Sequence, residues 1–115
     1  MLAKAALAAG DTAGAAAHLE VLDRNADNDA NFALELARIE RGRKNLPRAL
    51  EHATKAARIM AYDPATREFV AAIAVEAGDL DAARMHIEAL VRLEPSVAKH
   101  AQRLARIDEM IAKRP

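Results

Sequence analysis

The sequence predicts an all-α protein built from antiparallel helix pairs that recur with a 34-residue period. Three observations favour this fold class. Alanine supplies 30 of the 115 residues and aromatic residues only 3%, which suits closely packed helices and suits strands badly. The chain aligns with itself at a single 34-residue offset without insertion or deletion. Each aligned copy has one short polar turn between two stretches of helical periodicity.

The offset is defined first by three aligned turns, AGDTAGAA (9–16), RKNLPRAL (43–50) and AGDLDAAR (77–84). Columns around these turns stay apolar in every copy, which is difficult to obtain by chance. Before the turn they are Leu2, Leu36, Val70 and Leu104; Ala3, Ala37, Ala71 and Ala105; and Ala5, Ile39, Ile73 and Ile107. After it they are Ala15, Ala49 and Ala83; Leu19, Ala53 and Ile87; and Leu22, Ala56 and Leu90. We predict one repeat domain over 1–115, with copies at about 1–29, 30–63 and 64–97.

The first helix of each copy shows one buried stripe, such as Phe32, Leu36 and Ile39, at the three- and four-residue spacing of a helix. Within it, the column of Ala3, Ala37, Ala71 and Ala105 keeps a small residue. Small residues allow two helix axes to approach closely. We therefore expect leucine at Ala37 or Ala71 to overpack the helix pair.

Each turn combines a residue that ends a helix with one that caps the next. Gly10 and Gly78 tolerate the left-handed conformation that ends a helix. The Asp that follows each of them is expected to cap the next helix. The second copy has Lys44 in the glycine column. There we expect Gly42 or Asn45 to absorb the turn.

Asp63-Pro64 and Glu94-Pro95-Ser96 end the second and third copies and begin the next helices. Ser96 is expected to cap a long closing helix at 96–113, whose basic residues suit a solvating end of a helical array. Tyr62 is expected to pack at the junction between copies. The opening segment keeps register with Leu36 and Ile39, which favours a helix cut from a longer protein over a signal peptide.

The net charge of zero is the sum of four blocks of alternating sign. Residues 1–29, 30–63, 64–97 and 98–115 have net charges of −3, +3, −3 and +3. Two interpretations stay open. The charges are solvated outer faces, or they form a banded groove that orients a charged partner.

His18, His52 and His86 occupy one column of the 34-residue alignment. As a metal site they fail on distance, because packed helix axes are about 8–10 Å apart and zinc needs each nitrogen at about 2 Å. We expect a half-buried position beside the core stripe of the second helix. No metal, cofactor or catalytic residue is predicted, since the chain has no cysteine, no paired carboxylates and no glycine-rich phosphate loop.

The same inventory bounds the function. The chain is not expected to be an enzyme. A net charge of zero argues against nucleic-acid binding, and no apolar run approaches the roughly 20 residues of a membrane span. With no signal peptide, membrane segment or cysteine, a cytoplasmic location is favoured.

The repeat resembles the tetratricopeptide repeat over nearly the whole chain. The third copy, VEAGDLDAARMHIEALVRLEP (75–95), follows that pattern closely, with Pro95 at its close. The second copy departs from it at Lys44 and Ala61, and large aromatics are missing almost throughout. The resemblance implies a right-handed α-solenoid of about seven helices, whose first helices form a concave face that binds extended peptides or helices.

That resemblance identifies a candidate groove by residue. Its members are Asn31, Leu34, Arg38, Arg41, Glu68, Ala72, Val75, Lys99, Gln102 and Arg106. The arginines offer bidentate partners for a carboxylate, but Leu34 stands where chaperone-binding members have a lysine. The expected function is a protein–protein interaction scaffold or adaptor for a protein or peptide partner. The alternative is a structural or self-association segment, including a homodimer through Met1–Ala9.

Overall fold

The computed structural model describes Ala17 and residues 30–115. All regular structure in this part of the chain is helical, and no strand occurs in it. The chain divides into two compact units, Met1–Ile59 and Met60–Pro115. The first contains α3 (Ala30–Gly42) and α4 (Leu46–Ile59); the second contains α5 (Pro64–Ala77), α6 (Leu80–Leu93) and α7 (Ala98–Lys113). The opening copy, including His18 and Met1–Ala9, lies outside the described residues apart from Ala17.

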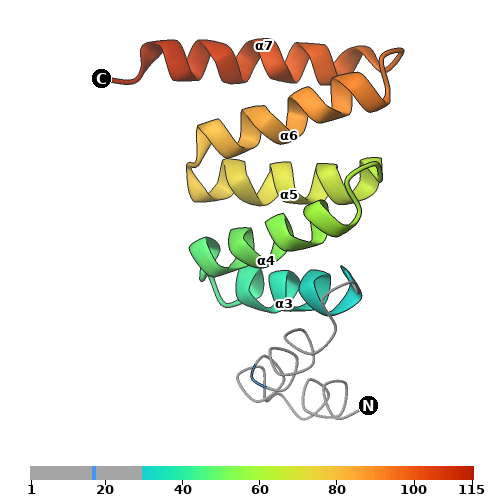
Figure 1. Cartoon of the computed structure of the whole chain (residues 1–115). Helices are drawn as coiled ribbons and strands as arrows, with labels where there is room; N and C mark the ends of the chain where they lie inside the picture. Colours follow the sequence, from blue (N-terminus) through green and yellow to red (C-terminus); the bar gives the residue numbers. More distant parts are fainter. Residues whose placement is uncertain (1–16, 18–29) are drawn as a thin grey trace. The chain divides into compact units, whose positions relative to one another are not determined.

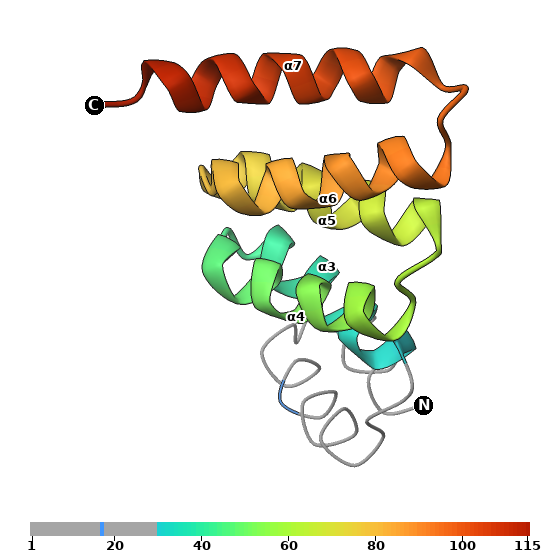
Figure 2. The same cartoon turned by 45° about the horizontal axis from the view of Figure 1, so that its top comes forward.

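Corresponding helices begin at corresponding positions in the two units. α3, α5 and α7 begin at residues 30, 64 and 98, and α4 and α6 begin at residues 46 and 80. The described helices therefore keep the 34-residue spacing of the sequence alignment. In the first unit α4 returns antiparallel to α3; in the second, α5 and α7 run in the same direction and α6 runs back between them (Figures 1 and 2).

The apolar columns form the core of both units. Fully buried members include Leu36, Ala49 and Ala53 in the first unit, and Val70, Ile73, Ala83 and Leu90 in the second. Ala37 and Ala71 are also 0% exposed. Ala105, the next member of their column, is exposed. The expectation of close helix packing at Ala105 is therefore wrong, because no described helix follows α7 to cover that side.

The second unit has the caps that its sequence predicts. The Asp63 side chain accepts two hydrogen bonds from Thr66, one from the amide at 3.2 Å and one from the side-chain hydroxyl at 2.6 Å. The Asp79 side chain accepts from the Ala82 amide at 3.0 Å. Gly78 ends α5 with φ 76°, a left-handed conformation in which glycine has no steric penalty. These groups satisfy helix ends that would otherwise lack partners.

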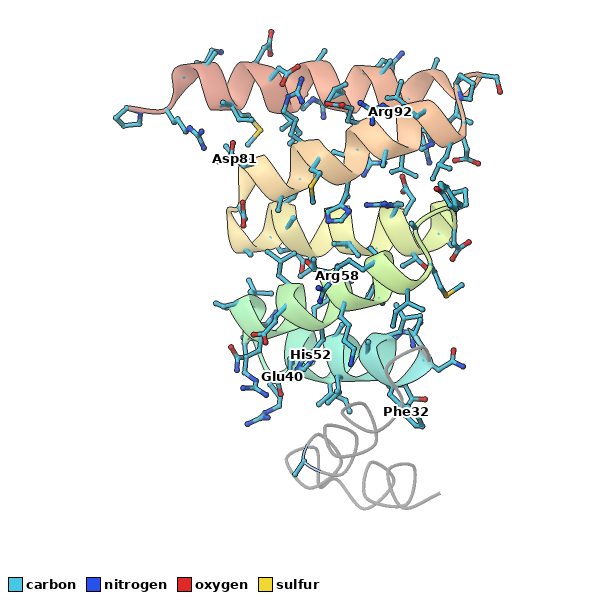
Figure 3. The ribbon with its side chains drawn as sticks, viewed as in Figure 1. Phe32, Glu40, His52, Arg58, Asp81 and Arg92 are labelled. Carbon is cyan, nitrogen blue, oxygen red and sulfur yellow. The ribbon has the colours of Figure 1, made fainter. Side chains whose placement is uncertain are left out.

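The turn between α3 and α4 departs from expectation. Lys44 itself takes the left-handed conformation, with φ 64°. The expectation that Gly42 or Asn45 would adopt it instead is therefore wrong. Glu40, labelled in Figure 3, is buried. Its carboxylate accepts hydrogen bonds from Arg43 and Asn45, both at 2.8 Å. Arg48 Nε lies 3.5 Å from the same carboxylate. This network holds the turn in the geometry that glycine provides in the third copy.

Lys44→Gly should raise the free energy of unfolding by about 0.5–1 kcal/mol. The left-handed conformation costs an L-residue about 1–2 kcal/mol, and the greater freedom of glycine in the unfolded chain offsets part of that gain. Urea unfolding measures the change. Gly78→Ala is the matched reverse substitution and should cost about 1 kcal/mol, since a Cβ there would meet no atom within 4 Å. A loss of stability in Lys44→Gly would contradict the assigned strain.

Two further expectations are wrong. α7 begins at Ala98, and its N-cap residue is Val97, which makes no side-chain cap bond. Ser96 is exposed because it and Pro95 are the central residues of a turn that the Val97 amide closes by donating to the Glu94 carbonyl at 3.1 Å. Tyr62 is 86% exposed, so it does not pack in a core.

Candidate functional site

The candidate groove residues of α3 already have interactions within the protein. Leu34 packs, partly buried, against a core cluster of Ala30, Ala33 and Ala56. Asn31 and Arg38 are exposed and Arg41 is half-buried, but each of the three makes an interaction of its own. The α3 residues thus have fewer side-chain groups available to a ligand than their sequence positions suggest.

In the second unit, Glu68 joins α5 to α7. One of its carboxylate oxygens accepts a hydrogen bond from Arg103 at 2.5 Å and lies 3.6 Å from His100 Nδ1. His100 is 1% exposed, and its Nε2 lies 2.8 Å from a Glu94 carboxylate oxygen. The Glu68 carboxylate is therefore already paired within the second unit. Its ion pair with Arg103 joins α5 to α7.

Two more ion pairs fasten α7 to α6. Arg84 Nε donates to Asp108 at 2.6 Å, and Arg114 lies 3.2 Å from Asp81. The hydrogen bonds from Arg84 to Asp108 and then to Glu88 raise the pKa of Arg84. Pairing thus occupies Asp108 as well as the cations Arg103 and Arg114. It also explains the opposite net charges of 64–97 and 98–115, which partly neutralise each other within the second unit.

The remaining α7 candidates are open to solvent. Lys99, Gln102 and Arg106 are exposed, and none has a side-chain hydrogen bond or ion pair within the described residues. Their spacing of three and four residues places them on one face of the helix. On α5, Ala72 is half-buried and Val75 is 43% exposed. Val75, Lys99, Gln102 and Arg106 are thus each open to solvent in the second unit, and these exposed residues of α5 and α7 are called the α5–α7 surface below.

Sequence reasoning missed two members of this surface. Met110 is 43% exposed, and Lys113 is exposed without an ion pair in the described part of the chain. Lys99, Arg106 and Lys113 recur every seven residues, which is two helical turns. That spacing was the available signal, and it extends the surface to the end of α7. The roles of His100 and Arg103 were missed because their partners on α5 lie outside the 34-residue columns.

His86 is a second buried histidine of the second unit. It is 1% exposed and not half-buried as expected, while His52 is half-buried. Arg67 donates to His86 Nδ1 at 2.9 Å and to the Ala61 carbonyl at 3.1 Å. Because a guanidinium only donates, Nδ1 accepts and the neutral ring has its proton on Nε2. Burial, and then the charge of Arg67, lower the pKa of His86 to about 4.

Stability should fall as pH is lowered through the range set by His86. Its pKa in the folded state lies below the ordinary 6.5, so the unfolded chain binds the proton first. The stabilisation is complete above pH 6.5 and is lost toward pH 4. Between pH 7 and pH 5 the loss should be about 2 kcal/mol.

The measurement is the urea midpoint of the wild type and of His86→Gln at both pH values. Carboxylates titrate alike in the two proteins, so the difference isolates His86. An identical pH dependence in both would show that His86 is not held neutral in the folded state.

Neither a metal site nor a membrane span is found in the described part of the chain. No group of three or more metal-ligating side chains is found among residues 30–115 and Ala17. Within the same residues, no helix has both the length and the apolar character needed to cross a bilayer.

Comparison with solved structures identifies the fold. MamA matches with a TM-score of 0.75 and 13% identity, over 98% of this chain and 66% of the MamA chain. The Yersinia enterocolitica type III secretion chaperone SycD, solved with a peptide of the translocator YopD, matches with a TM-score of 0.66 and 18% identity, over 96% of this chain and 87% of SycD. PcrH, solved with the chaperone binding region of PopD, matches with a TM-score of 0.65 and 22% identity, over 96% and 84%. No protein-family model and no curated protein sequence matches the chain.

The protein therefore has an all-α, tetratricopeptide-repeat-like fold. At these identities the likeness concerns the fold. The chain spans just under two thirds of MamA.

Proposed function

We propose that this protein is an interaction scaffold or adaptor that binds a peptide or helix along the first helices of its repeats. The proposal includes a single right-handed solenoid of about seven helices over 1–115, with no enzymatic activity of its own. One observation supports it most directly. Lys99, Gln102 and Arg106 of α7 are exposed and have no side-chain hydrogen bond or ion pair within the described residues, and Val75 of α5 is exposed as well. Two solved proteins of similar fold, SycD and PcrH, were crystallised with segments of their partners.

A displayed library of random peptides, selected on the whole chain, tests this function. We expect enriched peptides to shift the backbone amide resonances of α5 and α7. Lys99→Ala combined with Arg106→Ala should weaken their binding, while Arg58→Ala, an exposed cation on α4, should not. Failure to enrich any peptide, or shifts that avoid α5 and α7, would reject the function.

Self-association is the second candidate. Ala101, Ala105 and Ala112 leave one side of α7 exposed, whereas Ala37 and Ala71 are fully buried at the positions that correspond to Ala105. The sequence favours a homodimer through Met1–Ala9 as one form of self-association, and these residues lie outside the described ones. Sedimentation analysis decides it: a dimer supports self-association, and a monomer at all concentrations removes it.

A further inference from the structure

The surface between α5 and α7 contains a regular row of cations. Lys99, Arg106 and Lys113 follow one another at seven-residue intervals, so each step is about 10.5 Å along the helix axis. They drift only about 20° around the helix per step. None has an ion pair among the described residues. The row is a straight, charged edge that the fold itself does not neutralise.

An apolar position lies within this row. The Glu68–Arg103 bond joins residues 35 positions apart on two helices that run in the same direction (Figure 1). The same offset places Val75 of α5 level with Met110 of α7. Both side chains are 43% exposed. Met110 lies on the helix between Arg106 and Lys113, so the apolar pair is flanked by two cations.

Carboxylates near the row are few and mostly occupied. Glu68 is bound by Arg103, and Asp108 is bound by Arg84 on the opposite side of α7. Glu109 is exposed without an ion pair in the described region; three residues after Arg106 and four before Lys113, it lies beside the row, where three cations outnumber this one unpaired carboxylate. The charge of this edge is therefore positive, and its complement is an acidic ligand.

We propose that the α5–α7 surface binds an extended acidic segment with carboxylates at every third residue and an apolar residue between the last two. In an extended segment with the polyproline II conformation, residues three apart lie on the same side and about 9 Å apart along the chain, which is close to the cation spacing; in a β-strand they would point to opposite sides. Val75 and Met110 receive the apolar side chain. The segment binds through its side chains, so a free terminal carboxylate is not required. This inference rests on the proposed function, because it names the partner chemistry of the same surface.

Synthetic peptides with blocked ends test the assignment by titration of the isotope-labelled chain. The probes are Glu-Ser-Ser-Glu-Leu-Leu-Glu and its reverse, Glu-Leu-Leu-Glu-Ser-Ser-Glu, since the direction of binding is left open. Matched controls replace all Glu by Gln, replace Leu by Ser, or leave the carboxyl terminus free. We expect the Gln peptide to bind at least tenfold more weakly and the free terminus to make less than a twofold difference.

Variants of the protein assign the contacts. Arg106→Ala and Lys113→Ala should each weaken binding by about two- to fivefold, as expected for exposed ion pairs. Met110→Ala should weaken the Leu peptide and leave the Ser peptide unchanged. Glu109→Gln should strengthen binding about twofold, and Arg58→Ala should have no effect. These exposed residues are not expected to alter the melting curve.

The outcomes separate the two proposals. Equal binding of Glu and Gln peptides, unchanged affinity in Arg106→Ala with Lys113→Ala, or no binding of any designed peptide would overturn the acidic-segment assignment. If library peptides of other composition still bind to α5 and α7, the proposed function stands without it. If no peptide binds there, both fail.

Discussion

Leu90→Ala is expected to lower the free energy of unfolding by about 3 kcal/mol, within a range of about 2–5 kcal/mol for a fully buried leucine. Leu90 is 0% exposed in α6, the helix that lies between α5 and α7 in the second unit (Figure 1). Removing its side chain loses apolar burial and leaves a cavity. The chain has no disulfide to limit the loss, since it contains no cysteine. Urea unfolding followed by circular dichroism measures the change.

Leu93→Ala supplies the matched control on the same helix. Leu93 is half-buried, so its truncation leaves no closed cavity and should cost about 1 kcal/mol or less. Similar losses in the two variants would mean that α6 does not bury Leu90 more deeply than Leu93. The register of the second unit would then be wrong.

Much of the core could be predicted because burial follows the apolar columns. Val70, Ile73 and Leu90 recur at positions where every copy is apolar, and all three are fully buried. Such a position needs only its own helix pair to be covered. Ala105 shows the limit of that reasoning. Its residue type repeats, but the helix that would cover it does not follow α7 in the described chain.

The turn at Lys44 could not be predicted from residue preferences alone. Backbone hydrogen bonds from Lys44 to Arg41 and from Asn45 to Glu40, at 3.1 and 2.9 Å, reproduce the helix ending seen at Gly78. That hydrogen-bond register forces the left-handed conformation onto whichever residue occupies the position. Glycine is preferred at this position only because it adopts the left-handed conformation without the energetic penalty of other residues.

The candidate surface was predicted in part. Exposure of Lys99 and Arg106 agrees with their assignment to an open helix face, but Glu68 is engaged by Arg103 and His100. Contacts of this kind join different columns of different helices, so a repeat alignment does not reveal them. These contacts also give a third interpretation of the alternating charges. Within the second unit, ion pairs between the acidic block 64–97 and the basic block 98–115 hold α7 against the helices before it.

Ala71→Leu should lower the free energy of unfolding by about 1–3 kcal/mol, because extra methylenes in a filled core force side chains and backbone to shift. Ala71 is 0% exposed, and its position in α5 is one where the column keeps alanine. Ala37→Leu should have a similar cost in the first unit, where Ala37 is also 0% exposed.

Ala105→Leu makes the identical substitution at the next position of the same column, where the side chain is exposed. Its effect should stay within about 0.5 kcal/mol, as for other surface changes. Comparing Ala71→Leu with Ala105→Leu in urea therefore separates packing from the intrinsic helix preferences of alanine and leucine. If both variants unfold at the wild-type midpoint, the alanine column does not mark close helix packing. If Ala105→Leu is as damaging as Ala71→Leu, the outer side of α7 is covered in solution, which would favour self-association over an open helix face.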